Sequence, residues 1–305
     1  MNELQKGLLR EVAALDALPQ GAYNIRANGE KAARNTTANI DIVTKPDKDG
    51  IDIYIKDGTK NESVHIPVII SQSGIEEVVY NDFFIGEDCD VTIVAGCGIH
   101  CGDSKDSRHD GIHSFIVGKN SHVKYIEKHY GEGEGEGKRL MNPTTVVDLK
   151  EGATMELETA QIGGIDDTYR ITKAKVAKDA SIAIHDKLLT EGEQQAKAEM
   201  VVELNEDGTA ADIISRGVAK ENSFQEVTIE IDGNAACNGH AECDSIIMDK
   251  GVILATPKLK ASNVDASLIH EAAIGKIAGE QLDKLKTMGL TEEEAEQMIV
   301  DGFLR

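Results

Sequence analysis

A short turn phrase recurs along most of this 305-residue chain and divides it into brief alternating runs. In each copy, an aliphatic residue leads into a corner of Lys or Asn, an acidic residue and a small residue. The copies read IGEDCDV, VGKNSHV, LKEGATM, VAKDASI, LNEDGTA, VAKENSF and MDKGVI. Equivalent corners lie 28 to 32 residues apart, with one interval of 14, so the unit is about 14 residues, or 28 as a pair.

A strand-and-corner unit of this length, repeated without helical segments between strands, predicts a parallel β-solenoid with two strands per turn. A β-sandwich is the alternative, because it also places short strands at regular spacing. Sandwiches favour hairpin dipeptides, however, and Asp-Gly occurs only sporadically here. We therefore expect a mainly β fold, with a right-handed parallel β-helix over residues 21–262.

Helical periodicity is confined to the two ends of the chain. Leu4, Leu8, Val12 and Leu15 recur at helical spacing and Pro19 follows them, which predicts a short helix over 2–18, within an amino-terminal segment 1–20.

At the carboxyl end, helical spacing predicts a helix over 266–288 that ends at Gly289; its apolar positions are Leu268, Ala272, Ile277, Leu282 and Leu285. Thr291 and Glu294 form a capping-box pattern before a second helix. We expect residues 263–305 to be a helical segment that covers the open end of the solenoid and leaves one face for a partner.

The chain is strongly acidic, with 32 Lys and Arg against 54 Asp and Glu, for a net charge of −22. Such a chain repels nucleic acid and anionic lipid, so neither is an expected partner. The charge is spread over the corner phrases, as expected of a solvated face. The first 19 residues carry charges throughout and have no apolar run of signal-peptide or membrane-span length. We expect a cytoplasmic protein.

Five cysteines are an odd number in a chain too long to need disulfide staples, which favours metal binding or thiol chemistry. The string CGIHCGDSKDSRHDGIH places Cys97, His100 and Cys101 within five residues, enough for three ligands of a soft metal. A closed zinc site would take a fourth ligand, such as His109 or His113. The alternative is a glycine-rich corner whose Cys and His side chains make internal hydrogen bonds.

Residues 131–138 read GEGEGEGK, a segment that we expect to be too flexible and too charged to pack. It lacks the spacing of a phosphate-binding loop, and Arg139 follows Lys138 where Ser or Thr is required. We expect no nucleotide site on this chain.

A second thiol group lies in NGHAECDS, which carries Cys237, His240 and Cys243. His270 and Glu271 follow Cys243 after 27 and 28 residues, close to one repeat, so the three could converge from adjacent turns. Such a set suits an iron or iron–sulfur site, a zinc site or a Cys–His nucleophile pair. The alternative for His270 is a packing residue at a helix start.

The carboxyl third resembles the SufB/SufD family of iron–sulfur cluster assembly proteins. The resemblance is carried by Cys-Asp-Ser and its aliphatic run, a turn at Pro257, the phrase HEA…GKI…EQL, and the ending Gly-Leu…EA…MI…GF. It extends upstream through RHDGIHSFIVGKN and VAGCGIHC to GAYNIRANGE. Members of this family fold as a parallel β-helix with terminal helices.

The resemblance implies a non-enzymatic scaffold on which a transient iron–sulfur cluster forms for acceptor proteins, with a SufC-type ABC ATPase docked on the carboxyl-terminal helices. Cys243 matches the family's cluster thiol, and His270 and Glu271 match the His-Glu pair of the SufB branch, so the chain is SufB-like. It resembles the compact forms found without a separate SufD, which implies a homodimer with paired Cys243, His270 and Glu271 sets.

Two other functions remain open at this point. A structural zinc protein would use Cys97, His100 and Cys101 and act as an interaction module. A β-helix polysaccharide enzyme would need a secretion signal and aromatic platforms, and the chain has no Trp.

Overall fold

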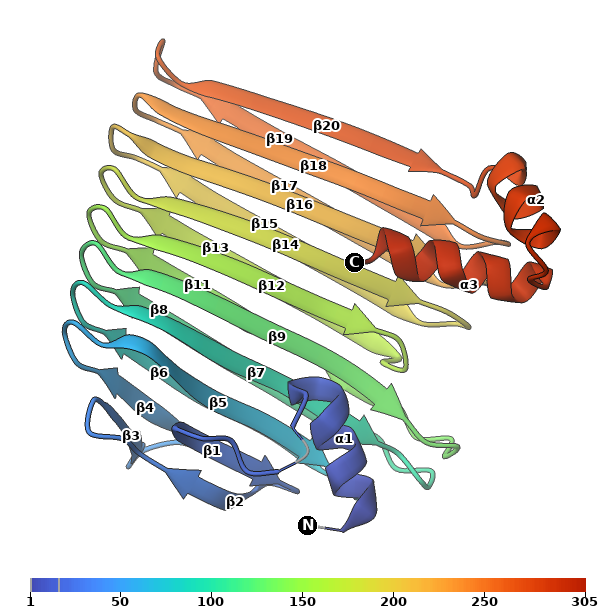
Figure 1. Ribbon diagram of the computed structural model, residues 1–305, viewed down its shortest axis with the longest axis horizontal. Helices are drawn as coiled ribbons and strands as arrows, with labels where there is room; N and C mark the ends of the chain where they lie inside the picture. Colours follow the sequence, from blue (N-terminus) through green and yellow to red (C-terminus); the bar gives the residue numbers. More distant parts are fainter. Residues whose placement is uncertain (1, 16) are drawn as a thin grey trace.

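The computed structural model describes residues 2–15 and 17–305 and contains a stack of strands in two facing sheets (Figure 1). In the first, sheet A, neighbouring strands run in the order β2 (Glu30–Asn35), β1 (Ala22–Ala27), β5 (Lys60–Ile70), β7 (Asp90–His100), β9 (His122–Glu132), β12 (Thr154–Ile162), β14 (Ser181–Thr190), β16 (Thr209–Ala219), β18 (Cys237–Ile247) and β20 (Ser267–Gly275).

Sheet B runs in the order β19 (Val252–Ala261), β17 (Phe224–Gly233), β15 (Gln195–Leu204), β13 (Asp167–Val176), β10 (Arg139–Met141), β8 (Ser107–Val117), β6 (Glu76–Ile85), β4 (Gly50–Ile55) and β3 (Ile40–Thr44). A further strand, β11 (Thr144–Leu149), continues the path of β10 between β8 and β13. From β4 onwards successive strands alternate between the sheets, with β10 and β11 together forming one strand path, and pairing is parallel everywhere except β1–β2 and β3–β4. The predicted parallel β-helix is confirmed.

The corner phrases fold as predicted because each contains one residue in the left-handed backbone region. Asp88 and Asn120 both have φ of 54°, and Gly152 and Gly208 occupy the same place in later turns with φ of 70° and 77°. Asn, Asp and Gly tolerate this conformation best, which explains why most corners use them; the corner VAKENSF has Glu221 there, with φ of 57°. A corner of this kind lets the chain cross from one sheet to the other within a few residues.

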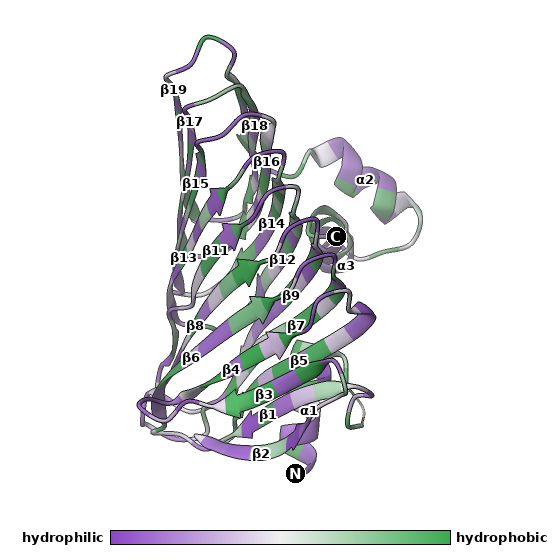
Figure 2. Cartoon of the chain, turned by 90° about the vertical axis from the view of Figure 1, so that its left-hand side faces the viewer, coloured by the Kyte–Doolittle hydropathy of each residue, from purple (hydrophilic) through white to green (hydrophobic). Residues whose placement is uncertain are grey.

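Side chains alternate inward and outward along every strand, visible as alternating colours in Figure 2. The inward set forms one continuous apolar core along most of the stack. Within it, Phe83 and Phe115 are register partners on adjacent strands and stack with ring centroids 4.4 Å apart. Because pairing is parallel and in register, each inward side chain packs on its counterpart in the next turn.

The amino-terminal helix, α1 (Glu3–Ala13), begins at an Asn2 capping box and is shorter than the predicted 2–18. Its buried Leu8 and Val12 lie over the outer face of sheet A at Gly98 and Gly96, where a side chain would collide with the helix. Lys128 and Glu11 add an ion pair of 2.6 Å. The helix therefore covers part of a sheet face.

The carboxyl end differs from the sequence prediction in one element. Residues 267–275, predicted as helix, form β20, which pairs in parallel with β18. The helical spacing of Leu268 and Ala272 coincides with an alternating pattern that also includes Ile274, and pairing with β18 decides between the two. Pro257, predicted at a turn, lies within β19, an edge strand where a missing N–H is tolerated.

Two helices follow β20: α2 (Gly279–Thr287) and α3 (Glu292–Phe303), the latter beginning at the predicted Thr291 capping box. The sequence predicted that these helices cover the open end of the solenoid. They lie instead on the outer side of sheet A (Figures 1 and 2). Arg216 donates to the Phe303 carbonyl at 3.4 Å and Lys187 to the Arg305 carbonyl at 2.7 Å. The final turn, β19 and β20, is left uncovered by them.

The GEGEGEGK segment is packed, which corrects the prediction of a flexible loop. The Gly135 N–H donates to the Cys101 carbonyl at 3.0 Å, and the Gly137 N–H donates to the Asp103 carbonyl at 2.9 Å. A Cβ at Gly135 would lie 2.3 Å from the Asp103 oxygen. The alternating glycines let two corner loops stack backbone to backbone, while Glu134 and Glu136 face solvent.

We predict that Gly135→Ala lowers the free energy of unfolding by about 1–3 kcal/mol or more, because the methyl group overlaps the neighbouring loop. Glu136→Ala, one residue away and exposed, should change it by less than about 0.5 kcal/mol. Urea unfolding of both variants measures the difference. Equal stabilities would contradict the packed arrangement.

Candidate functional site

Cys243, the predicted cluster thiol, lies on the inner face of β18, the last strand but one of sheet A. It is 3% exposed, and its register partners are Ser215 on β16 and Ala272 on β20. Burial, together with the nearby carboxylates of Asp244, Asp186 and Glu242, raises the pKa of the Cys243 thiol to about 11. The thiol is therefore protonated near neutral pH, and binding a metal would displace the proton.

His270 and Glu271 lie on β20, one turn beyond Cys243. The register partner of His270 is Ala241, so His270 is on the inward side, two residues before the partner of Cys243. Glu271 pairs with Glu242 on the outward side. Both are exposed because no strand follows β20. The structure thus places the thiol and the imidazole on one face, in diagonal positions, and the carboxylate on the other.

Cys97, His100 and Cys101 do not come together. Cys97 is buried on the inner face of β7, while His100 is on the outer face, with Nδ1 3.5 Å from Glu132 Oε1. The buried Cys101 thiol donates to the Lys105 carbonyl at 3.1 Å within the corner loop. Neighbouring strand residues point to opposite faces, so close spacing in sequence separates these side chains.

The NGHAECDS group is divided in the same way. Cys237 is buried on the inner face, and His240 lies on the outer face with Nδ1 2.8 Å from Asp212 Oδ1. Within residues 2–15 and 17–305, no three His, Cys, Asp and Glu side chains are arranged so that they could hold a metal ion.

A column of buried polar side chains lies inside the solenoid and was not predicted from the sequence. Sheet A stacks five of them in register, each 3–5% exposed: Glu127, Thr159, Asp186, Ser215 and Cys243. In the sequence each has at least one polar neighbour that faces outward, so nothing in the local pattern marks these five as inward residues. The signal that identifies them is the repeat itself, which puts polar residues at the same inward position of successive turns.

Short polar contacts connect members of this column to each other and to sheet B. The Thr159 hydroxyl donates to Asp186 Oδ1 at 2.7 Å, and Arg170 of sheet B pairs with the same carboxylate. In the neighbouring inward column, Cys97, His129 and Gln161 are register partners. Both polar atoms of the Gln161 side chain are buried without a hydrogen-bond partner. Buried polar side chains, several of them adjacent, stabilise the fold less than apolar side chains of the same size would. Their presence therefore points to a role other than packing.

Nearer the amino terminus, Glu77 of β6 is a buried carboxylate held by two side-chain partners. It accepts from Arg26 at 2.8 Å and contacts His109 Nδ1 at 3.0 Å. Burial alone would raise its pKa, but the hydrogen bonds and charges of His109 and Arg26 outweigh burial and lower the pKa of Glu77 to about 2.

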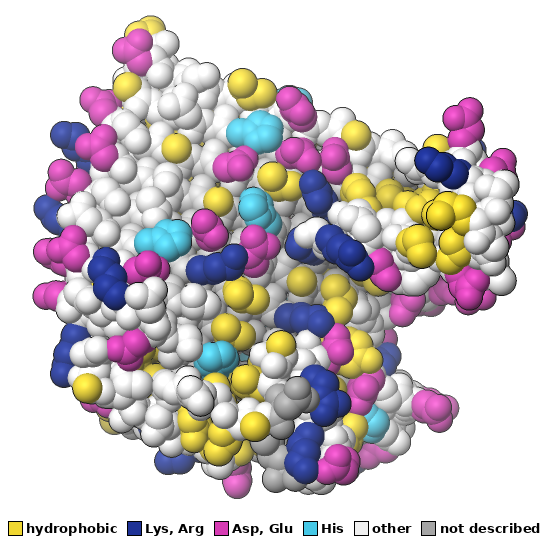
Figure 3. All heavy atoms as spheres, in the orientation of Figure 1, with side chains coloured by type: hydrophobic (Ala, Val, Ile, Leu, Met, Phe, Trp, Pro, Cys, Tyr) yellow, Lys and Arg dark blue, Asp and Glu magenta, His cyan; other side chains and the backbone are white. Residues whose placement is uncertain are grey.

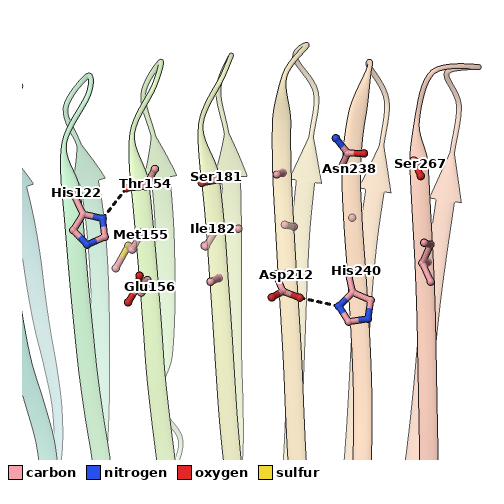
Figure 4. Close-up of a pocket in the computed structure, with 15 residues that line it drawn as sticks. His122, Thr154, Met155, Glu156, Ser181, Ile182, Asp212, Asn238, His240 and Ser267 are labelled. Carbon is pink, nitrogen blue, oxygen red and sulfur yellow. Dashed lines mark hydrogen bonds and ion pairs between the residues drawn. The ribbon is translucent and has the colours of Figure 1, made fainter.

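On the outside, sheet A carries an open groove of about 510 Å³ near the starts of β12 to β20 (Figure 4). Small side chains such as Ser181, Ala183 and Ala210 form its floor. The His240–Asp212 pair lies towards β20, and His122 lies at the other end, with its Nδ1 2.8 Å from Thr154 Oγ1. The groove ends at β20 and so adjoins the outer side on which Glu271 lies.

Comparison with known proteins identifies the family of this chain. Residues 74–303 match the family model described as "SUF system FeS cluster assembly, SufBD core domain". The chain belongs to the SufBD family. An iron–sulfur cluster assembly SufBD family protein of Methanocaldococcus jannaschii is 30% identical over 258 residues, covering 83% of this chain and 79% of that protein.

Other SufBD relatives are similar to the chain over the same region. A SufBD family protein of Pyrococcus horikoshii is 28% identical over 270 residues, with 83% of this chain and 77% of that protein covered. The iron–sulfur cluster assembly protein SufB of Bacillus subtilis is 28% identical over 83% of this chain, which spans 54% of that longer protein. No helix among the residues described in this SufBD chain has the length and apolar character of a membrane span.

We predict that acid destabilises this SufBD chain through Glu77. Its folded pKa of about 2 lies below the ordinary 4.5, so its stabilising contribution is present above pH 4.5 and is lost as pH falls towards 2. At about 1.4 kcal/mol per pKa unit, the upper bound is about 3 kcal/mol. Glu77→Gln should flatten the unfolding free energy between pH 4.5 and 2 in chelator-treated protein. An unchanged slope would contradict the role of Glu77.

Proposed function

We propose that the chain is a SufB-like scaffold on which a nascent iron–sulfur cluster forms between two copies. The observation that carries this proposal is the position of Cys243: an inward thiol in the last turn but one, with His270 exposed on the same face of the final strand. Thiolate sulfur is the soft ligand that iron–sulfur chemistry requires. Imidazole from His270 and carboxylate from Glu271 would hold iron more loosely, so that the cluster can be released to acceptor proteins.

The uncovered final turn supports a homodimer. β19 and β20 are the terminal strands of their sheets, so each has one edge without a strand partner. Apolar side chains are exposed there, including Val252 at 51% and Ile269 at 56%. An open edge with apolar neighbours favours pairing with another strand. A second copy related by a two-fold axis would bring its own Cys243, His270 and Glu271 to the same interface and supply the ligands that one copy lacks.

We infer that the partner is a SufC-type ABC ATPase that docks on α2 and α3. No described residue of α2 is buried, and Met288 and Met298 are 72% and 50% exposed. Figure 3 shows apolar side chains gathered where the two helices lie, and α2 projects from the body of the molecule. Exposed apolar patches of this kind mark protein-binding surfaces. ATP hydrolysis belongs to the ATPase, and its closure would move α2 and α3 together with the adjoining β20.

The cellular setting follows from the same features. All five cysteines are unpaired and buried, as expected in a reducing cytoplasm. The net charge of −22 argues against nucleic acid and anionic membranes as partners.

We predict that anaerobic reconstitution with iron and sulfide gives a brown, chelator-sensitive protein with one cluster per two chains. Light scattering should give twice the 32.9 kDa chain mass. Cys243→Ser should abolish the visible absorbance, because the soft ligand is lost. Cys237→Ser is the matched control: Cys237 lies on the same strand, is equally buried, and should be dispensable. Full reconstitution of Cys243→Ser would refute the ligand assignment.

For the partner, we predict that Met288→Glu with Met298→Glu reduces co-purification with a SufC-type ATPase at least tenfold, because two charges replace exposed apolar contacts. Val78→Glu, a change at a comparably exposed apolar residue on sheet B, should have no effect. Point changes are preferred to deletion from residue 266, which would remove β20. ATPase capture equal to that of the wild type would place the docking site elsewhere.

A further inference from the structure

A small chamber lies inside the solenoid, between sheets A and B and well away from Cys243 in the stack. Its volume is about 10 Å³, room for about one water-sized guest. Five ligand-type side chains line it: Cys97 and His129 from one inward column, Glu127, and His109 and His113 from β8. All five are buried, and the proposed cluster site uses none of them.

Gly111 makes the chamber possible. It lies between His109 and His113 on the inward side of β8, where a Cβ would be 3.5 Å from His109 Nε2 and 3.2 Å from His113 Nε2. The two nitrogens therefore flank the same small space. Gly111 does not have the left-handed backbone that would require glycine. Its absent side chain leaves room for a guest between the two imidazoles.

The other ring nitrogens of these histidines are already occupied. His109 Nδ1 contacts Glu77 Oε1 at 3.0 Å, and His113 Nδ1 contacts Tyr125 Oη at 2.5 Å. Each ring is thus oriented by a partner on one nitrogen while Nε2 faces the cavity, which is how metal-binding histidines are held in proteins. Opposite them, His129 Nδ1 is buried without a hydrogen-bond partner.

Charge in the chamber favours a cation. Arg26 pairs with Glu77, and Arg170 pairs with Asp186 while its charge also lowers the pKa of Glu127. Among the described residues, the partners of Glu127 within ion-pair distance are imidazoles, with Oε1 3.7 Å from His113 Nδ1 and 3.4 Å from His129 Nε2. With neutral imidazoles, the two buried carboxylates Glu127 and Asp186 share the single charge of Arg170, a costly arrangement that a further cation would relieve.

The chamber adjoins the point where the strand path of sheet B is interrupted. Asn142 and Pro143 separate β10 from β11, and Pro143 has no N–H to continue the ladder. Met141 and Pro143, on either side of this break, both line the chamber. Local opening at this break would let a small ion reach the chamber.

We propose that this chamber binds one divalent first-row transition-metal ion, Fe²⁺ or Zn²⁺, through the imidazoles of His109 and His113 and the thiolate of Cys97. His129 and Glu127 complete the donor set. Nitrogen and sulfur donors of this kind are those that such ions prefer. The side chains draw in around the ion on binding, because without it no three of the described donors are arranged for coordination. Cys97 releases its proton to solvent.

Cobalt is the probe, because Co²⁺ occupies such sites and its absorbance reports the ligands. Chelator-treated full-length chain is titrated with Co²⁺, and we expect visible d–d bands at one ion per chain, together with a thiolate-to-cobalt band in the near ultraviolet. Fe²⁺ under anaerobic conditions and Zn²⁺ are then added in separate arms. Displacement by each shows which ion binds more tightly.

Four variants locate the ion. Cys97→Ser should remove the thiolate band, and His113→Gln should weaken Co²⁺ binding at least tenfold. Gly111→Ala keeps every donor but fills the space between the imidazoles, and should also weaken binding at least tenfold. Cys243→Ser should bind one Co²⁺ per chain with the same d–d and thiolate bands as the wild type. Circular dichroism and thermal unfolding of each variant separate loss of binding from loss of fold.

The outcomes are distinct from those of cluster assembly. A thiolate band that is lost in Cys243→Ser and kept in Cys97→Ser would overturn the chamber site and assign the ion to the cluster thiol. Wild-type chain without a stoichiometric cobalt spectrum would also overturn it, leaving a proton on an imidazole as the cation beside Glu127. Cobalt binding that survives in Cys243→Ser, which fails to reconstitute a cluster, would support both proposals independently.

Discussion

In-register parallel pairing is the constraint on which the rest of this structure depends. Once one strand is placed, every inward residue lies on its counterpart in the next turn, so core contacts and polar contacts both become columns along the stack. The Phe83–Phe115 stack and the Thr159–Asp186 hydrogen bond arise in this same way. A shift of one residue in any strand would exchange the inward and outward sets, so the register is strongly specified.

The corners carried most of the information that sequence reasoning could use. The corner phrase around Asp88 or Asn120 is a local pattern, readable without knowledge of distant contacts, and its repetition predicted the solenoid; the structure adds that both residues have a left-handed backbone. Residues 267–275 were harder, because Leu268 and Ala272 satisfy both helical and strand spacing and only pairing with β18 decides. The glycines of 131–137 suggested flexibility, whereas their small size serves close packing against a loop distant in sequence.

The site residues show the same division. Cys243 and His270 share a face, as an interval of nearly one repeat suggested, but the true register partner of Cys243 is Ala272 and Glu271 points to the other side. The proximity of Cys97 to His100 in sequence was misleading, since neighbours in a strand face opposite ways. Buried polar residues such as Glu127 and Gln161 could be found only from their column positions, which require the register of the folded chain.

The two ends of the stack are chemically different, and this difference limits how large an assembly can grow. The first end is closed by strands of reversed direction, β2 and β3, whereas the last end presents parallel edges. A chain could not add its last turn to the first turn of another copy and continue the parallel ladder, so head-to-tail fibres are disfavoured. The last turns of two copies, β19 and β20, can however meet around a two-fold axis. Such a contact leaves no free parallel edge on either copy. The reversed strands at one terminus thus act as a stop to head-to-tail growth, and the proposed homodimer would be a closed assembly.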